Sequence, residues 1–172
     1  MAHFQDIQLL RTTYLRGPSI WTYRPVLEVW LDLGVLEDYP SNLLPGFNER
    51  LTAWLPGLVE HHCGVGHRGG FLERLQEGTW CGHVLEHTII ELLNLAGMSA
   101  EFGQTRSVRQ RGVYRMLSRC PVELVAQLAL QPGPALILAA INAQPFAVPT
   151  VLPAFEQAID ARFLWPSTPC IF

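Results

Sequence analysis

Residues 78–97, GTWCGHVLEHTIIELLNLAG, decide the fold and place three polar residues within an apolar pattern. Apolar side chains recur there at helical spacing, and Gly97 is a typical residue just beyond a helix C-terminus. The pattern predicts a helix over about 79–96. His83, Glu86 and His87 interrupt its apolar run, where unpaired polar groups cost free energy. We therefore expect these three side chains to have a partner.

The composition favours one compact domain over residues 1–172. Of the 172 residues, 49% are hydrophobic, which is enough for a real core. The net charge of -3 and the 16% of charged residues argue against a nucleic-acid partner. All 12 basic residues are arginine, which excludes Schiff-base chemistry and the lysine of a Walker-type phosphate loop.

The cysteine pattern and the chain start favour a cytoplasmic protein. The four cysteines lack the paired spacing of metal knuckles, and no basic-then-apolar signal segment opens the chain. The longest apolar run, near residues 135–141, is far shorter than the roughly 20 residues of a spanning helix. We therefore expect no membrane partner.

Helix and strand signals mix along the chain without regular alternation, which is typical of the α+β class. We expect a single compact domain with a small mixed or antiparallel sheet packed with helices. Strands are predicted over 7–15, around 59–63 and within 107–120. Helices are predicted over 25–33, 47–55, 71–78 and 79–96, with further helices over 121–144 broken at Pro-Gly-Pro.

Five of the six histidines lie between positions 61 and 87, and two of them share a helix face. His83 and His87 are four residues apart, so their rings can converge on one point, where neutral imidazole is a standard zinc ligand. Glu86 completes His-x-x-Glu-His, the reversed form of the zinc-protease helix, in which the glutamate is a base and not a ligand. The pattern predicts a Zn²⁺ site, although such sites also accept other divalent ions.

The third metal ligand is open between two residues. Glu91, one turn beyond His87, is our first choice, and His61 is its rival. Glu91 could instead orient His87 from behind. His62, Cys63 and His67 are weaker choices, because a glycine-rich turn holds its side chains less firmly. A histidine pair satisfied by backbone carbonyls in a core is the plain alternative to any metal site.

Long segments of the chain resemble the N-terminal domain of cyanophycin synthetase. They are LRGPSIW (15–21), LEDYPSNLLPGFNERL (36–51), LPGLVEHHCGVGHRGGFLERLQEGTWCGHVLEHTIIEL (55–92), LAGMSAEFGQTR (95–106) and GVYR (112–115). In that family, ATP-grasp and Mur-ligase-like domains follow and build a poly-aspartate backbone carrying arginine. The resemblance implies that these two domains are absent here.

The resemblance also implies a function. In the synthetases the N-terminal domain helps to hold the growing polymer, and in some it resembles a zinc metallopeptidase that cuts cyanophycin internally. We therefore expect a zinc-dependent endo-hydrolase with cyanophycin as its substrate. Glu86 would activate the metal-bound water, and Arg106 would bind a substrate carboxylate or steady the oxyanion.

Two alternatives to hydrolysis stay open. The domain could be a non-catalytic module that binds or docks cyanophycin, with a structural histidine cluster. It could also hold a structural zinc with four closed protein ligands. Assembly into a homo-oligomer is compatible with either alternative.

Overall fold

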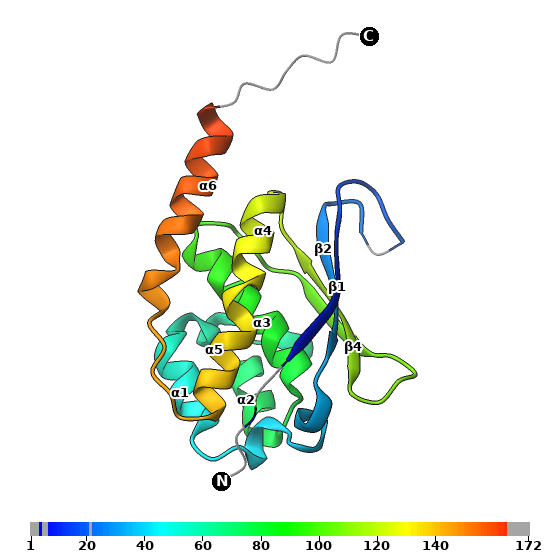
Figure 1. Cartoon of the computed structure of the whole chain (residues 1–172), viewed down its shortest axis with the longest axis vertical. Helices are drawn as coiled ribbons and strands as arrows, with labels where there is room; N and C mark the ends of the chain where they lie inside the picture. The colour runs from blue at the N-terminus through cyan, green and yellow to red at the C-terminus, as the bar shows by residue number, and fades with distance from the viewer. Residues whose placement is uncertain (1–3, 5–6, 21, 165–172) are drawn as a thin grey trace.

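The chain folds as a four-stranded sheet with helices packed on one side (Figure 1). This computed structural model describes residue 4, residues 7–20 and residues 22–164. The strands are β1 (Gln8–Leu15), β2 (Val26–Asp32), β3 (Gly103–Ser107) and β4 (Val113–Arg119). The helices are α1 (Phe47–Trp54), α2 (Gly70–Glu77), α3 (Cys81–Leu95), α4 (Glu123–Leu130), α5 (Pro132–Ile141) and α6 (Leu152–Leu164). The expected α+β class is confirmed.

The sheet is antiparallel throughout, in the order β1-β2-β4-β3. Leu27, Val29 and Leu31 of β2 alternate with Glu28, Trp30 and Asp32, so the two sets lie on opposite faces. The leucines and the valine join the buried cluster beneath the helices. The other face carries no described helix, because α3 and α4 pack on the apolar one.

Helix α3 is the central element of the core and packs against β3, β4, α4 and α5. It ends as its sequence predicts. Gly97 adopts a φ of +77°, the Met98 N–H donates to the Leu93 carbonyl at 2.9 Å, and the Gly97 N–H donates to Asn94. These two hydrogen bonds satisfy backbone carbonyls in the last turn of α3, and Gly97 just after the helix has the left-handed conformation typical of a helix C-terminus. The long helix expected over 79–96 is confirmed.

Two expected elements are wrong. The helix expected over 25–33 is strand β2, whose backbone pairs with β1 on one side and with β4 on the other. The strand expected over 59–63 is instead part of two 3-10 helices, Pro56–Glu60 and Cys63–Val65. That segment packs against α2 and α3 and not against the described strands of the sheet.

The stretch Glu123–Ile141 has the length and apolar composition of a membrane-crossing helix. It consists of α4 and α5, which meet at Gln131 and Pro132. Half of its most apolar window is buried within the molecule, and helices in a protein core pass the same test. The finding is weak support for a membrane segment.

Candidate functional site

A cavity of about 1240 Å³ lies beside α3 and explains the polar residues of this helix. The side chains that α3 contributes to its wall are His83, Glu86, His87, Ile90 and Asn94. Their spacing of three or four residues places them in one stripe along the helix. The opposite face of α3, with Val84, Leu85 and Leu92, is fully buried in the core. The stripe therefore faces the cavity and not an apolar interior.

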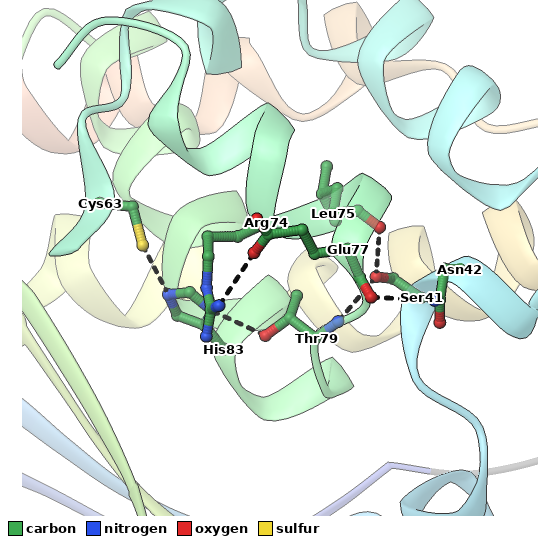
Figure 2. A network of polar contacts seen from close by, with 8 residues as sticks. All are labelled: Ser41, Asn42, Cys63, Arg74, Leu75, Glu77, Thr79 and His83. Carbon is green, nitrogen blue, oxygen red and sulfur yellow. Dashed lines mark hydrogen bonds and ion pairs between the residues drawn. The ribbon is translucent and has the colours of Figure 1, made fainter. Parts of the chain in front are cut away.

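His83 is fixed at both ring nitrogens (Figure 2). Its Nδ1 lies 2.9 Å from Thr79 Oγ1, and its Nε2 lies 3.4 Å from Cys63 Sγ. Burial lowers the pKa of His83 to about 4, and the nearby Arg74 guanidinium acts in the same direction. The ring is therefore neutral at physiological pH and has a lone pair to offer.

His87 ends a buried chain of three polar side chains. Glu91 Oε2 lies 3.0 Å from His61 Nε2, and His61 Nδ1 lies 2.9 Å from His87 Nδ1. A carboxylate only accepts, so His61 Nε2–H donates to it. With a neutral His61, its Nδ1 accepts from His87 Nδ1–H, which leaves the His87 Nε2 lone pair unprotonated. Burial, followed by His83 and His61, lowers the pKa of His87 to about 2.

Glu86 is a carboxyl group with an unmet hydrogen-bonding capacity. Its side chain is 5% exposed, and its Oε2 is buried without a described partner. Burial raises the pKa of Glu86 to about 7, against the opposing effect of a hydrogen bond with Thr105. A Cβ at Gly103 would lie 2.5 Å from Glu86 Cγ, so the glycine makes room for this side chain. The site is therefore suited to a cation or a strong donor.

The ligand atoms of Cys63, His83 and His87 lie within 4.8 Å of one another and form a candidate metal site. Two imidazoles and one thiolate are a donor set that zinc accepts, with a further position for another ligand. The structure brings together the predicted His83 and His87 but not the predicted Glu91, whose carboxylate bonds to His61 and lies over Gly57. His61, the rival, uses both of its ring nitrogens in that chain.

The structure places Cys63 beside His83 and His87, whereas the sequence made it a weaker choice because a glycine-rich turn holds its side chains less firmly. Close contacts fix the ends of this turn, whereas residues 64–68 between them are exposed. Gly66 N–H donates to the His62 carbonyl at 3.3 Å, and a Cβ at Gly70 would collide with the same carbonyl oxygen. Cys63 itself has a φ of +52°. No local sequence signal marks this conformation, which depends on contacts between the turn and α2.

Arg106 lies away from the cavity. Its neighbour Thr105 points to the α3 side, with Oγ1 at 3.4 Å from the Gly82 carbonyl, so the alternation of β3 turns Arg106 to the opposite face. Arg106 is also not among the residues that line the cavity. The structure thus separates it from Glu86, and no observation tests its predicted catalytic role.

The chain is similar to several curated proteins named cyanophycin synthetase. Over 113 residues it is 49% identical to the one from Geminocystis herdmanii, 48% to the one from Synechocystis sp. and 47% to the one from Crocosphaera subtropica. Each match covers 64% of this chain and 13% of the relative. The chain thus matches a small part of each relative's length.

These names correct the expected function. A synthetase makes the polymer, so the relatives point to the synthesis of cyanophycin and not to its hydrolysis. The expected zinc-dependent endo-hydrolase is therefore wrong, and the class of metallopeptidase-like hydrolases is wrong with it. The relation to cyanophycin itself is supported.

The family model described as "Cyanophycin synthase-like N-terminal domain" matches residues 28–142. The match spans well over half of the chain and includes most of β2, the cavity stripe of α3 and the whole of β3 and β4. The chain belongs to the cyanophycin synthase-like N-terminal domain family.

Proposed function

We propose that this domain binds cyanophycin while the polymer is being made. The observation that carries the proposal is a wide cavity, walled by α3, in a chain whose family is that of cyanophycin synthesis. The polymer carries arginine on a poly-aspartate backbone, so its binding site must receive guanidinium groups.

The cavity has acidic groups for that purpose. Glu60, Glu86 and Glu101 line it, and the buried Glu86 Oε2 lacks a described partner. A guanidinium group is a planar donor that pairs with carboxylates, and such charge-assisted bonds are stronger than neutral ones. Glu86 is therefore the residue on which we place recognition of one arginine side chain.

Binding of a labelled oligomer of arginyl-aspartate units, followed by fluorescence anisotropy at pH 8, tests the proposal. Glu86→Gln keeps the side-chain volume and removes the charge, and it should weaken binding by about ten- to a hundredfold, since a buried bond to a charged group contributes about 1.5–3 kcal/mol. The control is Glu156→Gln, an exposed position on α6 that is not part of the cavity wall. Equal affinity of the parent and Glu86→Gln would contradict the proposal.

We propose in addition that Cys63, His83 and His87 hold a divalent ion, with zinc as the first choice. The support is their donor chemistry and proximity. An ion there would form part of the cavity wall and fix the turn that carries Cys63 against α3. We also keep the cytoplasm as the expected location, and assembly into a homo-oligomer as compatible with this function.

A further inference from the structure

The face of the sheet that the helices leave open carries a row of arginines. Arg106 of β3 pairs with Arg115 of β4, Arg115 pairs with Trp30 of β2, and Trp30 pairs with Arg11 of β1. Directly paired residues in antiparallel strands point to the same side. These four side chains, which we call the arginine row, therefore cross all four strands of the sheet.

The tryptophan holds two of the guanidinium groups in place. The Cζ atoms of Arg11 and Arg115 each lie 5.8 Å from the centroid of a Trp30 ring. Arg119 pairs with Val26 on the same face, and its Cζ lies 4.8 Å from the Phe102 ring centroid. Stacking on aromatic rings limits the freedom of these side chains, which lowers the entropic cost of binding a partner.

The positive charge of this face exceeds its own acidic residues. Glu28 lies 3.1 Å from Arg11 and 3.9 Å from Arg115, and Asp32 accepts from the Gly34 N–H. No described residue forms an ion pair with Arg106 or Arg119. Four arginines thus face two carboxylates, while the whole chain has a net charge of -3.

This arrangement is costly unless something binds to it. Arg106 and Arg115 are direct cross-strand neighbours, and like charges in that position are destabilising. An interspersed acidic residue would remove the repulsion, yet Arg106 is exposed without one. A ligand with carboxylates could bridge the two guanidinium groups by paired hydrogen bonds.

The row also adjoins the cavity. β3 is an edge strand of the sheet, and its residues Gly103, Gln104 and Thr105 form part of the cavity wall. Gln104 shares the face of Arg106 by strand alternation. A chain that leaves the cavity over β3 would therefore meet the arginine row directly.

We propose that the arginine row binds an extended chain that carries regularly spaced carboxylates. That this chain is cyanophycin rests on the proposed function. An arginine that is joined to the backbone through its α-amino group would keep a free carboxylate for this surface to bind. The net charge of -3 disfavours a nucleic acid as the occupant, because a nucleic-acid-binding domain is typically basic overall as well as on its binding face.

Titration calorimetry at low ionic strength with polyaspartate, which has carboxylates and no guanidinium groups, tests the row by itself. Arg106→Gln should weaken binding about fivefold, and Arg11→Gln with Arg106→Gln should weaken it further, since each exposed ion pair contributes up to about 1 kcal/mol. Added salt should weaken binding by the parent as well. Arg16→Gln is the matched control, because Arg16 is an exposed arginine paired with Glu123 of α4.

Three further results would support or contradict the proposed role of the arginine row. Unchanged affinity of Arg106→Gln for polyaspartate, or no binding by the parent, would overturn the row while leaving cavity binding of cyanophycin intact. Binding of polyaspartate without any binding of cyanophycin would support the row and contradict the proposed function. Tighter binding of a single-stranded DNA oligonucleotide than of polyaspartate would overturn the choice of carboxylates.

Discussion

At the scale of single residues, the cavity stripe of α3 disfavours the charged forms of its ionisable groups. Burial lowers the pKa of His83 and His87 and raises that of Glu86, so each group resists the charged state that water would allow. A cationic ligand beside Glu86 would stabilise its carboxylate form and lower its pKa. The raised pKa of Glu86 also predicts how the free energy of unfolding changes with pH.

The first prediction concerns Glu86 and pH. The folded-state pKa of about 7 exceeds the usual 4.5, so folding favours the protonated carboxyl, and stability is lost as pH rises from about 4.5 through 7. Glu86→Gln removes this loss. The free energy of unfolding of the variant, minus that of the parent, should rise by about 3 kcal/mol between pH 4 and pH 8.

Urea denaturation at both pH values measures this difference. Any cost of burying the amide is independent of pH and cancels, as do the shifts of the two histidines, which both proteins share. A difference that stays constant with pH would show that folding does not raise the pKa of Glu86.

The second prediction concerns the metal. Co²⁺ added to the parent should give a thiolate-to-cobalt charge-transfer band, which Cys63→Ser should abolish. Glu91→Gln should keep the band and lower the affinity by up to about tenfold, because Glu91 fixes His61, and His61 in turn orients the candidate ligand His87. If Glu91→Gln abolishes binding and Cys63→Ser does not, Glu91 is the ligand and Cys63 is not.

At the scale of elements, glycines decide how closely β3 approaches α3. Gly103 faces Glu86, and a methyl group there would lie 2.5 Å from Glu86 Cγ and 2.8 Å from its carboxyl carbon. Because Gly103 has no side chain, Glu86 can take its place in the cavity wall.

The third prediction follows from this contact. Gly103→Ala should destabilise the protein by about 1–3 kcal/mol, the usual cost of overpacking, and should also weaken oligomer binding by displacing Glu86. Gly17→Ala is the control, since nothing lies within 4 Å of a Cβ at that position. Thermal unfolding measures both variants, and a stable Gly103→Ala protein would show that Glu86 can move aside at no cost.

The sequence predicts those elements whose signals are local. The long helix and its Gly97 end are confirmed because apolar spacing and a C-terminal glycine act within a few residues of each other. Strand β2 was missed because Pro25 resembled a helix start, whereas partners on both sides of the strand decide its conformation. The same holds for the site, where Cys63 joins His83 through a turn that only tertiary packing fixes.

At the scale of the whole molecule, the domain has two surfaces of different charge. The cavity beside α3 includes Glu60, Glu86 and Glu101, and the open sheet face has an excess of arginine. Edge strand β3 contributes to both. A polymer that alternates guanidinium and carboxylate groups matches this division, whereas a purely acidic or purely basic chain would fit only one surface.

The most direct test of the central claim is an amide-shift map of the labelled domain titrated with a soluble arginyl-aspartate oligomer. Binding in the cavity predicts that the largest shifts occur at backbone amides in its wall, around Ile90, Ala100, Gly103 and Thr105, with smaller shifts along β4. Shifts that are absent, or that are confined to α1 and α6 on the helical side, would contradict the claim.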